Sequence, residues 1–166
     1  MNNRNEEVSM NSDQEVQKTV EAVNAFLYQV SRINHEAAKR VGLTDSEFQM
    51  DYYLDPDQAL TFSQIVNCSG LPKQTAHSCL KSQMDKGWIA ASDNSRSRSR
   101  TFFLTEEGFR ILHPKIQAFK EIEARVCQSF SCSQRQEFAN LLDTFSEKMN
   151  LFIEDLNIED PADQPD

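Results

Sequence analysis

The sequence predicts a mainly α-helical protein built around a winged helix-turn-helix with a small β-hairpin wing, flanked by long helices at both ends. Three observations favour this fold class. Residues 61–105 contain two helix signatures, a turn and two strand-like runs in that order. Apolar residues recur at helical spacing before and after this segment. The 166 residues include only 4 Gly and 5 Pro, which is few for a loop-rich fold.

The N-terminal part of the chain predicts one long helix. Residues 1–11 are polar, and we expect them to be mobile. Ser12 and Glu15 match a capping box, in which each side chain hydrogen-bonds the other residue's backbone N–H. We expect the helix to run to about Arg40, with Gly42 after its end. Its apolar positions alternate in steps of four and three, as in a helix that packs along another: Val16, Val20, Val23, Leu27 and Val30.

A short helix and a short strand are expected next. Thr44 and Glu47 form a second capping box. Pro56 disfavours a helical conformation at the preceding residue, so this helix is expected to end near Asp55. Residues 59–61 could then form a strand beside the wing. Residues 43–105 as a whole are interpreted as the winged-helix region.

The central segment begins with a third capping box, formed by Thr61 and Gln64. Gly70 stands where the end of a helix favours a positive φ. Pro72 suits the start of the next helix, which we expect to end at Gly87. One face of that second helix carries a mostly apolar stripe, namely Ala76, Cys79, Leu80, Gln83 and Met84.

The opposite face of this second helix is polar. Its side chains can hydrogen-bond base edges and phosphates, which makes the helix a candidate for reading DNA. A polar outer face is equally common on ordinary surface helices, so the face alone decides nothing. The candidate contact residues are Lys73, Gln74, Thr75, His77, Ser78 and Lys81.

A basic hairpin follows and favours the DNA-reading interpretation. Residues 88–92 and 101–104 are rich in aromatic, β-branched and small residues, as strands are. Between them Arg96, Arg98 and Arg100 alternate with serines, which suits contact with phosphates or a narrow minor groove. The alternative is a loop that only aids solubility.

Acidic and basic residues are distributed unevenly along the chain. Residues 1–60 contain 5 basic and 11 acidic residues, which gives a net charge of −6. Residues 106–166 contain 6 basic and 13 acidic residues, which gives −7. Residues 61–105 contain 6 basic and 2 acidic residues, giving +4 within a total of −9. Acidic flanks would therefore orient a nucleic acid toward the central segment.

Two further helices are expected after the wing. Thr105 can cap a helix from Glu106 to about Phe130, with a kink caused by Pro114. Ser133 and Gln136 match a fourth capping box. The last helix carries a second apolar seam, and residues 157–166 form an acidic tail that we expect to be disordered. The seam comprises Phe138, Leu142, Phe145, Met149, Phe152 and Leu156.

The two seams predict a homodimer. Residues 12–42 and 106–156 are interpreted as the dimerisation region, because a small domain cannot easily cover both seams by itself. The alternative is a monomeric bundle in which the seams pack against each other.

Several short motifs together resemble the MarR family of transcriptional regulators. They are Leu43-Thr44, then Met84-Asp85-Lys86-Gly87-Trp88-Ile89, then Leu104-Thr105-Glu106-Glu107-Gly108. The chain departs from the family pattern at Pro72, where Ser is usual, and at Ala91, where Arg is usual. In the wing only Arg98 matches the family's arginines.

The resemblance implies a DNA-binding homodimer with a small-molecule effector pocket where the dimer arms meet the reading module. Candidate lining residues are Phe26, Val30, His35, Tyr52, Tyr53 and Leu112.

Other function classes find little support. No phosphate-binding loop, nucleophile elbow or His-Glu-x-x-His motif is present, so we expect neither an enzyme nor a cofactor. No apolar run spans a membrane and no secretion signal is evident. The 4 Cys lack a disulfide framework, which favours the cytoplasm. Cys68 and Cys79 are interpreted as core residues, and no metal site is expected from the separated residues His35, His77 and His113.

The sequence thus predicts a cytoplasmic, homodimeric, sequence-specific DNA-binding regulator, expected to be a repressor. It would bind a pseudo-palindromic operator in double-stranded DNA and respond to a small-molecule effector. Two alternatives stay open: a winged-helix module that binds protein, and a regulator that responds to metal or to thiol oxidation.

Overall fold

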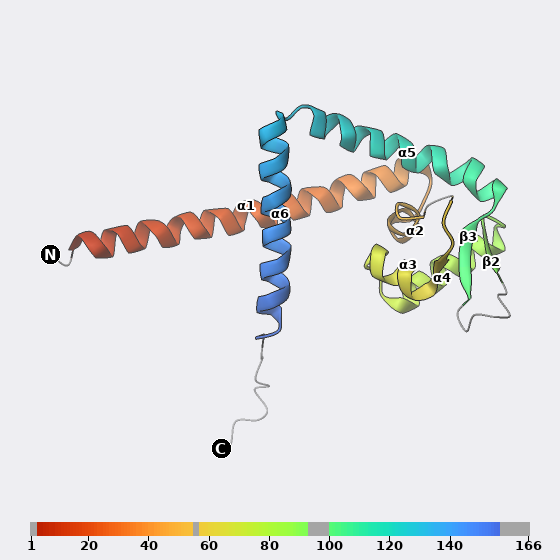
Figure 1. The fold of residues 1–166 in the computed structure, drawn as a ribbon, viewed down its shortest axis with the longest axis horizontal. Helices are drawn as coiled ribbons and strands as arrows, with labels where there is room; N and C mark the ends of the chain where they lie inside the picture. Colours follow the sequence, from red (N-terminus) through yellow and green to blue (C-terminus); the bar gives the residue numbers. More distant parts are fainter. Residues whose placement is uncertain (1–2, 55–56, 93–99, 157–166) are drawn as a thin grey trace, which may run out of the picture. The chain divides into compact units, whose positions relative to one another are not determined.

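The computed structural model describes residues 3–54, 57–92 and 100–156, with side chains from residue 13 onward (Figure 1). The described chain forms two compact units, residues 1–119 and 120–166, and α5 continues from the first into the second. The elements in chain order are α1 (Asn3–Val41), α2 (Asp45–Asp51), β1 (Leu60–Thr61), α3 (Phe62–Ser69), α4 (Lys73–Asp85), β2 (Ile89–Ser92), β3 (Thr101–Leu104), α5 (Glu106–Gln128) and α6 (Cys132–Ile153).

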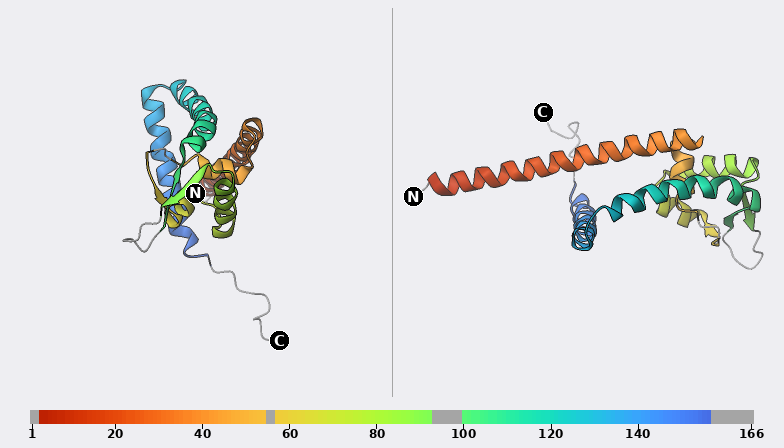
Figure 2. Two further views of the ribbon diagram at one scale, coloured as in Figure 1. Left: turned by 90° about the vertical axis from the view of Figure 1, so that its right-hand side faces the viewer. Right: turned by 90° about the horizontal axis from the view of Figure 1, so that it is seen from above.

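The first helix is longer than the sequence pattern predicts. α1 is one uninterrupted helix that begins at Asn3, so the expected start at Ser12 is wrong (Figure 2). The segment before Ser12 has no Gly or Pro to stop a helix, and the helix therefore includes it. The C-terminal end is as expected: Gly42, at φ 71°, follows Val41 directly.

The second helix has the expected start and an earlier end. The Thr44–Glu47 capping box is present, with both reciprocal hydrogen bonds. α2 ends at Asp51 rather than near Asp55, because the backbone N–H groups of Tyr53 and Leu54 bond the carbonyl oxygens three residues back. These tighter turns end the α-helix before Pro56 can act on it.

The central segment is a winged helix-turn-helix. The Thr61–Gln64 capping box opens α3, and Gly70 ends it at φ 66°. The three strands form an antiparallel sheet in the order β1-β3-β2, and β2 pairs with β3 from Ile89↔Leu104 to Ser92↔Thr101. The mainly α fold class, the hairpin wing and the short strand beside it are therefore confirmed.

Two apolar clusters hold the first unit together. One joins α2, α3, α4 and the sheet, and Met50 and Ile65 are its most buried large side chains. The other joins the end of α1 to α2 and the first half of α5, around Phe48 and Leu112. Both clusters contact α2, which thereby fixes α4 relative to α1 and α5.

The last two helices differ in detail from expectation. α5 continues through Pro114 without a break in the helix, and the kink expected there stays a prediction. α6 is capped by the Ser131–Gln134 pair, so the expected Ser133–Gln136 box is wrong. With Ser131 as the cap, Phe130 packs on Phe138, with ring centroids 6.1 Å apart, and Arg135 donates to the carbonyl oxygen of Phe130 at 2.6 Å.

Candidate nucleic-acid interface

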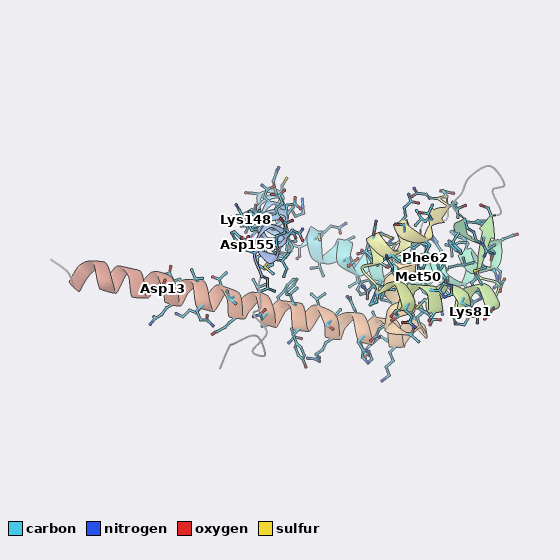
Figure 3. The ribbon with its side chains drawn as sticks, turned by 90° about the horizontal axis from the view of Figure 1, so that it is seen from below. Asp13, Met50, Phe62, Lys81, Lys148 and Asp155 are labelled. Atoms are coloured by element: carbon cyan, nitrogen blue, oxygen red, sulfur yellow. The ribbon has the colours of Figure 1, made fainter. Side chains whose placement is uncertain are left out.

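The two faces of α4 separate as the sequence predicts. Ala76, Cys79, Leu80 and Gln83 are buried against the rest of the first unit. The opposite face is open: Thr75 is half-buried, and the other five candidate residues are exposed. Lys81 of this face lies at the margin of the group of short helices in Figure 3, where Met50 of α2, which is buried, is also labelled. The exposed set is Lys73, Gln74, His77, Ser78 and Lys81.

Local contacts orient two of these exposed side chains. The Ser78 hydroxyl donates to the Gln74 carbonyl oxygen at 3.0 Å, which leaves its lone pairs free to accept from a base amino group. The His77 ring lies edge-on to Phe62 of α3, with centroids 6.2 Å apart. Phe62 is itself packed against the core, so it limits the directions available to His77.

The structure describes only the base of the wing, where β2 and β3 pair. The Ser92 and Thr101 hydroxyls are 2.6 Å apart across the last pair of β2 and β3. Arg100 is exposed, and its guanidinium lies 5.9 Å from the ring centroid of Phe102. Arg96 and Arg98 lie outside the described residues. Arg100 is therefore the wing arginine whose position the structure gives.

A charged contact anchors the C-terminal end of α4 to α2. The Lys86 ammonium donates to Glu47 Oε1 at 2.8 Å and lies 4.6 Å from the Trp88 ring centroid. Thr44 donates to the other carboxylate oxygen of Glu47 through its N–H at 3.0 Å and its hydroxyl at 3.1 Å. Burial alone would raise the pKa of Glu47, but these hydrogen bonds outweigh it and lower the pKa.

A second polar contact between these helices is fully buried. Asp51, the last residue of α2, is 3% exposed and Gln83 of α4 is 0% exposed. Gln83 Nε2 donates to both Asp51 oxygens, each at 2.8 Å. Burial raises the pKa of Asp51 to about 7. Sequence reasoning missed this pair, and the one available signal was the polar interruption of the apolar stripe at Gln83.

The base of the wing is joined tightly to the start of α5. The Thr105 hydroxyl donates to the Gly87 carbonyl oxygen at 2.7 Å and accepts from the Gly108 N–H at 3.0 Å. Gly108 packs against Trp88 so closely that an added Cβ would lie 1.9 Å from the Trp88 carbonyl oxygen. The Leu-Thr-x-x-Gly pattern therefore has a steric explanation here.

The candidate effector residues are placed in different environments. Leu112 is in the second apolar cluster and Tyr52 packs against that cluster, with its ring edge-on to Tyr53 at 5.1 Å between centroids. Tyr53 and Phe26 are about half exposed. Val30 is half-buried and His35 is exposed. An open hollow near His35 is lined by polar residues of α1 and by Asp45, whose carboxylate lies 2.9 Å from His35 Nδ1.

The thiols and possible metal ligands are also placed. Cys79 is buried, but Cys68 is exposed, so its interpretation as a core residue is wrong: it lies on the outer side of α3. Cys127 and Cys132 are exposed as well.

Among the described residues, no group of three or more His, Cys, Asp or Glu side chains is arranged to hold a metal ion. In the same part of the chain, no helix has the length and apolar character to cross a membrane.

Comparison with known proteins identifies the fold. No protein-family model and no curated protein matches the sequence. Among solved structures, MarR family transcription regulator SP03579 gives a TM-score of 0.72 at 16% identity, covering 90% of this chain and 99% of that one. The MarR family regulator NMB1585 of Neisseria meningitidis gives 0.72 at 21% identity, covering 82% and 97%.

A third solved structure includes nucleic acid. It is a MarR family transcriptional regulator of Listeria monocytogenes complexed with 26mer DNA, with a TM-score of 0.66, 16% identity and coverage of 85% and 97%. The protein therefore has the winged-helix fold of MarR family transcription regulators.

Proposed function

We propose that this protein is a DNA-binding transcription regulator of the MarR type, and that the outer face of α4 reads the base sequence. The observation that carries this proposal is the place of the exposed polar face: it lies on the second helix of the helix-turn-helix, whose other face is fixed in the core. Gln74 and His77 are suited to base edges, while Lys73 and Lys81 are suited to phosphates. The Listeria relative, which has the same fold, is complexed with 26mer DNA, and this supports the proposal.

The protein is proposed to act as a homodimer. Phe145 and Phe152 of α6 are 44% and 62% exposed, and no residue of α6 is buried within the single chain. A second copy would cover such a surface, and its two-fold symmetry would present two α4 helices to one duplex. The operator would then be a pseudo-palindrome with half-sites about one helical turn apart.

The regulatory role is proposed as repression in the cytoplasm, with release by a small molecule. One structural neighbour, BpsR of Bordetella bronchiseptica, has its DNA binding regulated by 6-hydroxynicotinic acid, and its TM-score is 0.59 at 15% identity. An effector of this chain would act by changing the relative population of dimer shapes that fit or do not fit the operator.

The proposed division of roles on α4 can be tested by duplex titrations at several salt concentrations. Lys81→Ala is expected to weaken binding to mixed-sequence and selected duplexes alike and to flatten the salt slope by about one unit. Gln74→Ala or His77→Ala is expected to weaken a selected duplex only, by about 1–3 kcal/mol for each lost base contact. Lys18→Ala on α1 removes the same charge away from α4 and serves as the control.

The results would separate the candidate functions. If Lys81→Ala behaves like Lys18→Ala, the outer face of α4 does not contact phosphates and the assignment fails. If the wild-type protein binds no duplex even at low salt, the DNA-binding proposal fails. That result would favour the alternative, a winged helix that binds protein through an acidic surface.

A further inference from the structure

The Asp51–Gln83 contact has an incomplete set of hydrogen bonds when Asp51 is charged. Both oxygens of Asp51 are occupied by the single Gln83 Nε2 group, at 2.8 Å each. The other atom of the amide, Gln83 Oε1, is buried and has no hydrogen-bond partner among the described residues. A buried polar atom without a partner is costly and requires an explanation.

A proton on Asp51 would complete the contact. A carboxylate and an amide oxygen both only accept hydrogen bonds, so neither can satisfy the other. A neutral carboxylic acid can donate its O–H to Gln83 Oε1 while its carbonyl oxygen accepts from Nε2. The terminal torsion of a glutamine amide is soft, which allows its nitrogen and oxygen to readjust to such a partner. All the polar atoms of the pair would then have partners.

The surroundings favour the neutral acid. Burial is the largest influence on the pKa of Asp51 and raises it, and the negative charge of Glu47 on the same helix also raises it. The hydrogen bond from Gln83 lowers the pKa, and so do the charges of Lys86 beyond α4 and Lys115 of α5. The result is a pKa of about 7. The nearby Cys79 thiol on α4 has a raised pKa, mainly through burial.

We propose that Asp51 and Gln83 are a proton-dependent positioning contact for α4, complete when Asp51 is a neutral acid and weakened when Asp51 ionises. Asp51 and Gln83 are positioning residues here, because they act on DNA through the placement of α4. The effect on DNA rests on the function proposed above, whereas the effect on the α2–α4 contact does not.

The direction of the pH dependence follows from linkage. Below the ordinary pKa of 3.8 the acid is neutral in both folded and unfolded chains. As the pH rises from there to about 7, the unfolded chain releases the proton and the folded chain retains it, so the stability contributed by this group falls. Above the folded pKa the full cost of a buried charge is present.

The first test compares the unfolding equilibria of the wild type and Asp51→Asn. The asparagine keeps the shape and the hydrogen-bonding capacity but cannot ionise. The folding equilibrium constant of the variant relative to the wild type is expected to rise roughly ten- to hundredfold between about pH 5 and about pH 8. Asp85→Asn, on the exposed side of α4, is the matched control for the removal of one carboxyl group from this part of the chain. The same pH dependence of the ratio in both variants, or a constant ratio for Asp51→Asn, would overturn the proposal.

The second test does not depend on whether that variant folds. Carbon NMR of wild-type protein with labelled aspartate carboxyls should show one carboxyl that titrates near neutral pH. Gln83→Met removes its hydrogen-bond partner and should shift the midpoint of that carboxyl alone, which assigns it. The proposal fails if every aspartate carboxyl titrates below about pH 5.

The third test measures placement and DNA binding separately. Hydrogen-exchange protection of α4, corrected for intrinsic rates, should fall above neutral pH in the wild type and remain constant in Asp51→Asn. The wild type should also lose affinity for a mixed-sequence duplex relative to Asp51→Asn over the same range. If α4 loosens but neither protein binds DNA at any pH, only the proposed function fails. If protection is independent of pH, the positioning contact is refuted.

Discussion

Gly108 is the residue at which the start of α5 packs against the backbone of Trp88, at the base of the wing. An alanine there would bring its Cβ within 1.9 Å of the Trp88 carbonyl oxygen, and a backbone atom cannot move aside as the end of a flexible side chain can. We expect Gly108→Ala to lower the free energy of unfolding by about 1–3 kcal/mol, the usual cost of overpacking. Thermal and urea denaturation of the full chain would measure it.

A neighbouring substitution provides the control for this prediction. Glu107→Ala changes an exposed residue of the same helical turn, and we expect the stability to change by about 0.5 kcal/mol or less. Equal stability of Gly108→Ala and wild type would show that the two backbones separate at little cost.

The residues of the candidate site were predictable to different degrees. Lys73, Gln74, His77, Ser78 and Lys81 follow from helical periodicity, because an apolar stripe on one face assigns the other face to the outside. Asp51 and Gln83 do not follow, because they lie 32 residues apart and only the packing of α2 on α4 brings them together. The exposure of Cys68 was missed because the nearby Leu71 suggested an apolar face, whereas α3 buries Ile65 and Ser69 and leaves Cys68 outside.

At the level of elements, the Glu47–Lys86 ion pair joins the start of α2 to the end of α4. Lys86→Met would leave the Glu47 carboxylate, whose side chain is 9% exposed, without its cationic partner. We expect a loss of about 1–3 kcal/mol at neutral pH, measured by urea denaturation. Lys86→Arg is the control, because it keeps the positive charge, and we expect a smaller loss.

The pH dependence of this pair has a definite sign. The contacts lower the pKa of Glu47 in the folded chain, so the stabilisation is present above the ordinary carboxyl pKa of 4.5. It is lost as the pH falls through the lowered value. The difference between wild type and Lys86→Met is therefore expected to shrink in acid, and a difference that grows in acid would contradict the assignment.

The elements themselves were predictable where local signals decide them. Thr44 with Glu47 and Thr61 with Gln64 form the expected capping boxes, because each stands directly before an apolar helical pattern. The choice between Ser131 and Ser133 was not decidable from spacing, since each has a glutamine three residues later. The packing of Phe130 on Phe138 accompanies the first choice, and such a contact is invisible in the sequence pattern.

At the scale of the whole molecule, the exposed seam of α6 carries the dimer prediction. Phe145→Asp together with Phe152→Asp would place two charges in the proposed interface, which is strongly unfavourable. We expect loss of the dimer in sedimentation and loss of DNA binding. Asn140→Asp with Thr144→Asp adds the same charges on the polar side of α6 and is expected to preserve the dimer.

The outcome would be informative in either direction. A Phe145→Asp and Phe152→Asp protein that remains dimeric would exclude this seam as the interface. Loss of the dimer in both double variants would indicate general damage to α6 rather than loss of a specific contact.

The continuous helix α1 has a consequence for how the protein is made. Its 39 residues precede the winged-helix segment in the chain, so they are synthesised before that segment. Local hydrogen bonds allow such a helix to form within about a microsecond, whereas synthesis proceeds at roughly 5–20 residues per second. Val16 and Val20, which are 60% and 48% exposed even in the finished chain, thus stay exposed to solvent for seconds. For a chain that pairs through these helices, the final step of assembly is bimolecular, and its rate rises with the concentration of nascent and completed chains.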